Sequence, residues 1–330
     1  DFETRLTDIL QGRRCVYYPF LHRGKWEKPL FSAWKRAREK HRGDASLQSA
    51  FIDISPLLAE MRLFKSPQEI QCMQYAIDAS VVAHLKVMEG VSTCDFEYQA
   101  LALFEQQLMH QGLTETAYPS IVASGSNACI LHYTQYQRAF EPNDLLLIDA
   151  GAEWQGYAAD ITRTYPVRGK WSYEQGLVYD LVLEAQLQGI ALIRPGVAWT
   201  AIQLKILQVL TQGLVDLGIL HGHVDDLIAT QAYKDFYMHN SGHWLGLDVH
   251  DAGTYQQQGQ PRLLENQMVL TVEPGLYFSM RNEKIDKRWR GIGVRIEDDV
   301  LVSSQGCQVL SAKLPKTRAD IEAVMLNAAQ

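Results

Sequence analysis

The chain has 330 residues, of which 47% are hydrophobic and 21% are charged, proportions typical of a globular protein with a sizeable core. Lys and Arg number 31 against 38 Asp and Glu, and the net charge of −7 argues against a nucleic-acid-binding protein, which needs a basic surplus. No apolar run reaches the ~18 residues of a membrane span, and no secretory signal opens the chain. We therefore expect a cytoplasmic protein without nucleic-acid or membrane partners.

The five cysteines do not form a recognisable pattern. Their number is odd, their spacing is wide, and no C-x-x-C pair occurs among Cys15, Cys72, Cys94, Cys129 and Cys307. The sequence predicts neither a disulfide framework nor a cysteine-ligated zinc site, which fits a reducing compartment.

Helix signals begin at Ser66-Pro67-Gln68-Glu69, where Ser66 is the expected N-cap and Glu69 completes a capping box. An apolar stripe at three- and four-residue spacing predicts a helix over 67–89. His84 lies on that stripe, and we expect it to be a core histidine rather than a ligand. A second helix is predicted over 95–111, ending at Gly112.

The elements that follow repeat this order. Strands are predicted at 145–148 and 160–165 around a turn at Glu153–Gly156, and then a helix starts at Ser172. Thr200 is the expected cap of a further helix that runs to about Gly218, and strands follow at 268–272 and 293–296. Two rounds of helix, helix and hairpin predict one α+β domain with an internal pseudo-two-fold repeat, in which helices cover an antiparallel sheet. We place this domain at 66–330.

Two acids stand out in the first predicted hairpin. The midpoint between Asp149 and Asp160 falls in the predicted turn, so a regular hairpin would set them directly opposite each other. Directly opposed residues have Cβ atoms roughly 4.5–5.5 Å apart, and like charges there are destabilising. Two such carboxylates need a shared proton or a cation between them.

The second hairpin repeats the feature, with Glu273 at the end of one strand and Glu297 in the other. Alternation places Arg295 and Glu297 on one face. Any one of these acids could be an ordinary surface carboxylate, but the recurrence of acid pairs at equivalent places in a repeated unit argues against that interpretation for the set.

Histidines at 239, 243, 250 and 132 supply nitrogen donors. His239 and His243 have the spacing of a helical zinc motif, but Asn240 takes the place of the expected Glu, and Gly242 disfavours a helix. Four carboxylates with one imidazole suit Mn²⁺, Co²⁺ or Fe²⁺, without excluding Zn²⁺. Four acids exceed what one ion needs, which indicates two metals.

These residues fall in five blocks that together resemble the pita-bread metallopeptidases, and among them most closely the Xaa-Pro aminopeptidases. The resemblance covers about residues 60–330. The blocks are Ile148-Asp149-Ala150-Gly151, Ala159-Asp160-Ile161-Thr162-Arg163-Thr164, Ser241-Gly242-His243-Trp244-Leu245-Gly246-Leu247-Asp248-Val249-His250-Asp251, Thr271-Val272-Glu273-Pro274-Gly275-Leu276-Tyr277 and Gly293-Val294-Arg295-Ile296-Glu297-Asp298-Asp299.

The resemblance implies hydrolysis of the bond between an N-terminal residue and a following proline, by a hydroxide that bridges two divalent metals, usually manganese. The implied metal ligands are Asp149, Asp160, His243, Glu273 and Glu297. The residues implied in catalysis are His132, which lines the proline pocket, His239 and His250, which stabilise the intermediate, Glu273, which shuttles a proton, and Arg295, which holds a ligand carboxylate. The implied partners are peptides with proline in second position, and the family tends to form homo-oligomers.

The resemblance also implies a longer N-terminal α/β domain, so we expect residues 1–65 to be the C-terminal part of an incomplete N-terminal domain plus a linker. Asn240 departs from the small residue that the family has after its first site histidine. Two alternatives stay open: an Xaa-Pro dipeptidase (prolidase), with the same fold and metals, and a metal-free binding protein on this scaffold, which the five filled ligand positions disfavour.

Overall fold

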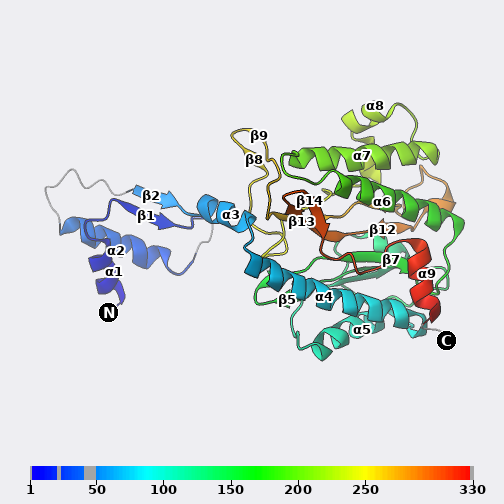
Figure 1. Ribbon diagram of the computed structural model, residues 1–330, viewed down its shortest axis with the longest axis horizontal. Coiled ribbons are helices and arrows are strands. Elements are labelled where there is room, and N and C mark those ends of the chain that lie inside the picture. Colours follow the sequence, from blue (N-terminus) through cyan, green and yellow to red (C-terminus); the bar gives the residue numbers. More distant parts are fainter. Residues whose placement is uncertain (1, 21–23, 41–49, 328–330) are drawn as a thin grey trace. The chain divides into compact units, whose positions relative to one another are not determined.

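The computed structural model describes residues 2–20, 24–40 and 50–327. The chain divides into two compact units, Asp1–Arg62 and Leu63–Gln330 (Figure 1). Among the described residues, we find no helix with the length and apolar character needed to cross a membrane.

The first unit is a small βαβ arrangement. Strands β1 (Cys15–Tyr18) and β2 (Ala50–Asp53) pair in parallel, and helix α2 (Glu27–Glu39) belongs to the crossover that a parallel pair requires. Helix α1 (Phe2–Leu10) packs on α2, and α3 (Ser55–Leu63) follows β2. The buried core of this unit consists of Leu10, Leu30, Ala33 and Ala37. The assignment of 1–65 to an incomplete domain stays a prediction.

The first half of the second unit opens with α4 (Pro67–Gly90), whose start follows the predicted capping box. Ser66 Oγ accepts the Glu69 N–H, and Glu69 Oε2 accepts the Ser66 N–H at 2.7 Å. Helix α5 (Glu97–His110) packs against α4. A three-stranded antiparallel sheet in the order β3-β4-β7 follows, formed by β3 (Ile121–Ser124), β4 (Leu145–Asp149) and β7 (Thr162–Pro166). Strand β3 was not predicted.

The second half repeats this arrangement. Helices α6 (Tyr173–Ala191) and α7 (Trp199–Asp216) pack together, and short α8 (Val224–Ala229) follows. A second antiparallel sheet has the order β10-β13-β14, and β11 pairs with β12. The remaining elements are β5 (Glu153–Trp154), β6 (Tyr157–Ala158), β8 (Gln256–Gln257), β9 (Gln260–Pro261), β10 (Val269–Val272), β11 (Gly275–Tyr277), β12 (Gly293–Arg295), β13 (Asp298–Ser303), β14 (Gly306–Val309) and α9 (Arg318–Asn327).

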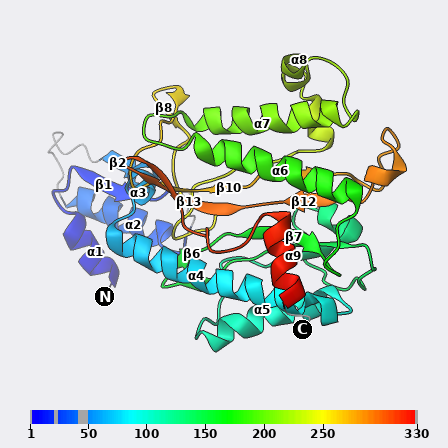
Figure 2. The same ribbon diagram turned by 45° about the vertical axis from the view of Figure 1, so that its right-hand side comes forward.

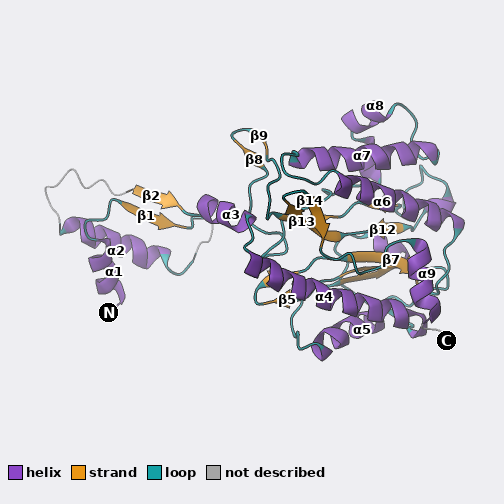
Figure 3. Cartoon of the chain, viewed as in Figure 1, coloured by secondary structure: helices purple, strands orange, loops and turns teal. Residues whose placement is uncertain are grey.

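The repeated order confirms the predicted α+β pita-bread fold with its internal two-fold repeat. Helices α4 and α5 lie on one side of the strands and α6 and α7 on the other, in both ribbon views (Figures 1 and 2). The strands fill the middle of the unit (Figure 3). The two halves meet at an antiparallel bridge between Thr162 and Glu297, where the Glu297 N–H donates to the Thr162 carbonyl at 3.1 Å.

The predicted direct opposition of Asp149 and Asp160 is wrong. Asp149 pairs with Thr162, because the turn is centred on Gln155 and Gly156, with φ of 52° and 85°. Two successive residues at positive φ are the signature of a type I′ hairpin turn. The turn centre therefore lies one position later than predicted, so Thr162 replaces Asp160 opposite Asp149. Asp160 lies two residues before β7 begins, and a shift of two places leaves its side chain facing the same way. The acids become diagonal neighbours, which in a regular ladder lie roughly 7–8 Å apart, with their Cβ atoms somewhat closer.

The predicted Thr200 cap is also wrong. Ala198 is the N-cap of α7, with extended backbone and no side-chain cap bond, and Thr200 lies in the first turn. The Ala198 backbone is held instead by a bridge to Leu263, so a tertiary contact starts this helix where no capping side chain does.

Buried Arg163 joins the two halves below the bridge. Its Nη1 donates to the carbonyls of Thr162 at 3.0 Å and Glu297 at 2.7 Å, and its Nη2 donates to Asp298 at 2.7 Å. Lys316 Nζ lies 2.6 Å from the other Asp298 oxygen. Burial disfavours the Asp298 carboxylate, but the charges of Arg163 and Lys316 outweigh this and lower its pKa. Removing one partner of such a buried pair costs about 3–5 kcal/mol.

His84 gives a test of this core. It is fully buried, its Nε2 lies 2.9 Å from the Ala150 carbonyl, and burial lowers its pKa from 6.5 to about 3. Below pH 6.5, His84 is protonated in the unfolded chain but stays neutral in the folded protein. The free energy of unfolding therefore falls by about 1.4 kcal/mol for each pH unit, down to the pKa of the folded state.

We expect His84→Gln to be less stable than the wild type at pH 7 but to lose less stability between pH 7 and 5, measured by urea unfolding. The exposed His110, exchanged for Gln, is the control and should keep the wild-type pH dependence. An unchanged pH slope in His84→Gln would contradict the assignment.

Candidate metal centre

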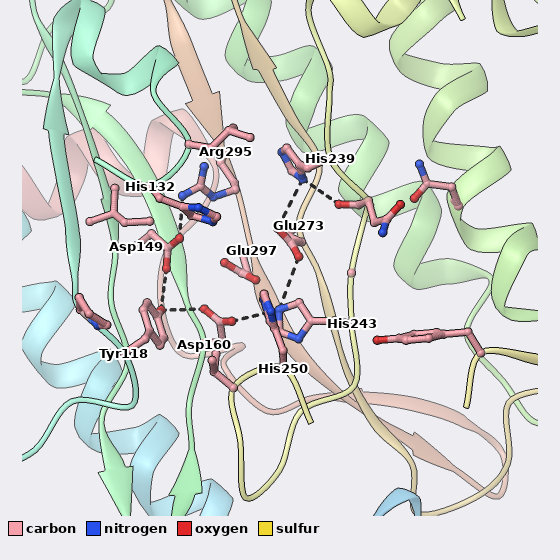
Figure 4. Close-up of a pocket in the computed structure, with 18 of the residues that line it drawn as sticks. Tyr118, His132, Asp149, Asp160, His239, His243, His250, Glu273, Arg295 and Glu297 are labelled. Carbon is pink, nitrogen blue, oxygen red and sulfur yellow. Dashed lines mark hydrogen bonds and ion pairs between the residues drawn. The ribbon is translucent and has the colours of Figure 1, made fainter. Parts of the chain in front are cut away.

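The predicted site residues line a cavity of about 950 Å³ between the two halves of the second unit. Asp149, Asp160, Glu273 and Glu297 all reach it, as do His132, His239, His243, His250 and Arg295. Figure 4 shows these side chains turned toward one another, with Glu297 in the middle of the group.

The acids of the first hairpin share one partner, Tyr118. Its hydroxyl lies 2.6 Å from Asp149 Oδ1 and 2.7 Å from Asp160 Oδ1. The backbone at Gly151 passes close to the Ala159 carbonyl oxygen, and a Cβ at this position would overlap it, so only glycine fits there. Asp299 Oδ2 accepts the Asp160 N–H at 3.1 Å, which fixes the backbone of that acid from behind.

The second half contributes two acids and a histidine. Glu297 Oε2 accepts the Thr162 hydroxyl at 2.6 Å, across the bridge between the halves. His243 Nε2 lies 3.2 Å from Asp160 and 3.6 Å from Glu273. Single ligand atoms of Asp160, His243 and Glu297 lie within 4.8 Å of one another, a spacing that one metal ion can fill.

The ring of His243 is oriented for metal binding. Its Nδ1 lies 3.0 Å from the Trp244 carbonyl, which can only accept, so Nδ1 carries the proton. In the neutral ring the Nε2 lone pair then faces Asp160 and Glu273. A backbone carbonyl that fixes the tautomer in this way is typical of metal-binding histidines.

The pKa values of the site residues indicate that this cavity favours positive charge. Burial raises the pKa of Glu273 to about 7 against the opposing charge of His243, and burial with the charge of Asp160 raises the pKa of Glu297 well above its usual range. Burial also raises the pKa of Asp149, against the opposing effect of Arg295. Burial disfavours the charged His243 ring, yet its hydrogen bond and attraction to Asp160 raise its pKa to about 9. The raised pKa values mean that these carboxylates bind protons readily to reduce their negative charge. Divalent cations can serve the same purpose, because the oxygen and nitrogen donors suit them.

Arg295 links one acid to a chain of polar groups. Its Nη2 donates to Asp149 Oδ2 at 2.6 Å and its Nη1 donates to the Tyr277 hydroxyl at 2.9 Å. His239 Nδ1 lies 2.7 Å from the Asn240 carbonyl and therefore carries the proton, so Nε2 accepts from Tyr277 at 2.8 Å. Burial, with the nearby Arg295, lowers the pKa of His239 to about 3 and keeps the ring neutral.

Comparison with known proteins places this geometry in a family. Residues 71–304 match metallopeptidase family M24. The chain belongs to metallopeptidase family M24.

Relatives in this family cover nearly the whole chain. It is 46% identical to an Xaa-Pro aminopeptidase of Haemophilus influenzae, over 98% of this chain and 73% of that protein. It is 41% identical to the Xaa-Pro aminopeptidase of Escherichia coli K12, over 99% of this chain and 74% of that protein.

Solved structures give the same result. Pseudomonas aeruginosa aminopeptidase PepP matches with a TM-score of 0.95 and 45% identity, over 100% of this chain and 74% of that chain. Escherichia coli aminopeptidase P with the inhibitor Pro-Leu matches with a TM-score of 0.93 and 40% identity, over 99% and 74% of the two chains.

Membership of this metallopeptidase family implies divalent metal ions, and the donor set of the M24 site fits them. The sequence did not single out Tyr118 or Thr162, although both bond ligand candidates. Thr162 stands two places after Asp160 in the sequence, and alternation along extended backbone places both side chains on the same side. This spacing could have identified Thr162. Tyr118 stands in a loop without a periodic pattern, so only the fold reveals its position.

Removal of metal should destabilise this M24 protein, because a cation relieves the repulsion among its buried acids. We expect chelator to lower the melting temperature and Mn²⁺ at 100 times its Kd to restore about 2.7 kcal/mol. Asp160→Asn should lose most of this response. Asp78→Asn, at a half-exposed acid paired with Lys313, is the matched control and should keep it. An equal metal response in both variants would speak against Asp160 as a ligand.

Proposed function

We propose that this chain is an aminopeptidase that hydrolyses the peptide bond between an N-terminal residue and a following proline. The observation that carries the proposal is the convergence of four acids and His243 from both halves on one cavity. Relatives with identities of 40% to 46% include proteins named Xaa-Pro aminopeptidase and aminopeptidase P, which supports the same activity.

Two divalent ions, with manganese as our choice, would be held by five residues. These residues would be Asp160 and Glu297, which lie in the centre of the group, together with Asp149, His243 and Glu273. When bound, the ions would lower the pKa of a coordinated water and polarise the scissile carbonyl.

The remaining steps fall to side chains of this protein. Glu273 lines the cavity, and its Oε2 lies 3.6 Å from His239 Nδ1, so we expect it to pass a proton to the leaving proline nitrogen. His239 and His250 flank the metal donors, and the His250 ring lies 4.2 Å from that of His243. They would orient the carbonyl under attack, while His132 and Leu131 line the wall that would receive the proline ring.

The activity is tested by release of the first residue from an Xaa-Pro-Yaa tripeptide. We expect turnover with Mn²⁺, loss of turnover with chelator, and about two metal ions per chain by elemental analysis. Turnover of Xaa-Pro dipeptides alone would instead identify a prolidase. Metal-independent turnover, or none with metal bound, would refute the proposal.

His243→Ala should abolish turnover and weaken metal binding, because it removes the one nitrogen among the five proposed metal ligands. The control is His221→Ala, at an exposed histidine after α7, which should leave kcat/KM unchanged. Measured kcat/KM with saturating Mn²⁺ decides, and wild-type activity in His243→Ala would remove this residue from the site.

A further inference from the structure

A buried carboxylate outside the metal site holds one wall of the cavity. Glu97, the first residue of α5, is fully buried. Its Oε1 accepts the Ser124 N–H at 2.7 Å, the Ser124 hydroxyl at 2.8 Å and Asn127 Nδ2 at 3.0 Å. Its Oε2 accepts the Tyr133 hydroxyl at 2.7 Å and the Arg138 N–H at 3.2 Å. One carboxylate therefore binds five donors.

These donors mark out a single segment. Ser124 ends β3 and Arg138 lies at the far end of the excursion, so Glu97 ties both ends and, through Tyr133, the middle. The Glu97 N–H also donates to the Arg138 carbonyl at 3.1 Å. We name residues 124–138 the wall segment.

The wall segment reaches the cavity next to the anchored tyrosine. Leu131, His132 and Thr134 line the cavity, and His132 precedes Tyr133 directly. Figure 4 shows His132 beside Arg295 and Asp149. Between Cys129 and Arg138 the segment has no helix or strand to fix its position. The carboxylate holds Tyr133, next to His132, while Tyr136 bonds to Tyr98 and Ser120 further along the segment.

We propose that Glu97 is a positioning residue that sets the substrate pocket by anchoring the wall segment. The proposal rests on the proposed function, since it takes the cavity as the binding site for the substrate's proline. Glu97 touches none of the metal-ligand candidates named above, so its effect is on substrate binding rather than on metal.

The chemistry of the contact makes an amide a poor substitute. Each carboxylate oxygen accepts a backbone N–H, from Ser124 on one side and Arg138 on the other. A glutamine has only one acceptor oxygen, so its NH₂ group would face one of these N–H donors. An unsatisfied buried donor costs about 1–3 kcal/mol, which the wall segment can avoid only by moving.

The test compares Glu97→Gln with the wild type, both loaded with Mn²⁺, on an Xaa-Pro-Yaa tripeptide. We expect KM to rise about tenfold, the equivalent of about 1.4 kcal/mol, with kcat within about threefold and metal content unchanged. Hydrogen exchange should accelerate in residues 125–138. Tyr133→Phe removes one of the five donors and should change KM and exchange in the same direction, by about threefold.

Glu69→Gln is the matched control. Glu69 also accepts a backbone N–H, from Ser66 at 2.7 Å, and a tyrosine hydroxyl, from Tyr157 at 2.7 Å, but it caps α4 and does not line the cavity. It should lower the melting temperature and leave KM unchanged. A rise in KM equal to that of Glu97→Gln would reduce Glu97 to a general stability effect and overturn the proposal.

Other outcomes separate the two proposals. Faster exchange with unchanged KM would show that the wall segment does not shape the pocket. Unchanged exchange would show that Glu97 does not anchor it. If Glu97→Gln does not fold, Tyr133→Phe decides by the same measurements. If the wild type cleaves no Xaa-Pro peptide, the proposed function fails, and the exchange data alone judge the anchor.

Discussion

Asp149, Asp160, Glu273 and Glu297 bring four carboxylates into one cavity, and burial together with repulsion raises the pKa of three of them, Asp149, Glu273 and Glu297. Such a group is costly unless positive charge is supplied. The protein itself provides Arg295 to Asp149 and a neutral donor, Tyr118, between Asp149 and Asp160. Arg295 compensates only part of the negative charge, and bound cations would compensate the rest. This agrees with a metallopeptidase of family M24.

A second layer of charge keeps the acids in place. Glu297 and Thr162 form a β-bridge between the two halves, and Arg163 donates to the carbonyls of both. Asp298 points away from the cavity toward Arg163 and Lys316, while its neighbour Glu297 points in. Adjacent acids thus serve opposite purposes, one in the site and one in its support.

The sequence predicted helices α4 to α7 and the acids of both hairpins because each had a local signal, whereas the roles of the cavity histidines and Arg295 came from the family resemblance. The Ser66–Glu69 capping box and the acidic blocks are readable one segment at a time. The predictions were wrong where a contact distant in the sequence, or an unusual backbone conformation, determined the local structure. The Gln155–Gly156 turn shifted the register by backbone φ, and a bridge to Leu263 began α7 at Ala198 instead of Thr200.

Missed contributions have the same cause. Tyr118 and Glu97 act on residues more than twenty positions away, at Asp149 and Ser124, and no spacing rule connects them. Strand β3 was missed because a four-residue strand inside a loop gives little periodic signal. The one-position error at the turn did not displace Asp160 from the site face, since a two-residue slip along a strand preserves alternation.

The bridge between Thr162 and Glu297 also bears on how the chain folds. The bonded side chains are 135 positions apart in the sequence, so they close a long loop. The chain loses conformational entropy in closing this loop before the contact can stabilise the fold. Each half can form its helix pair and sheet from nearer neighbours first. We therefore expect the binding site to form late in folding, and a half-folded chain to have its acids without the geometry to hold an ion.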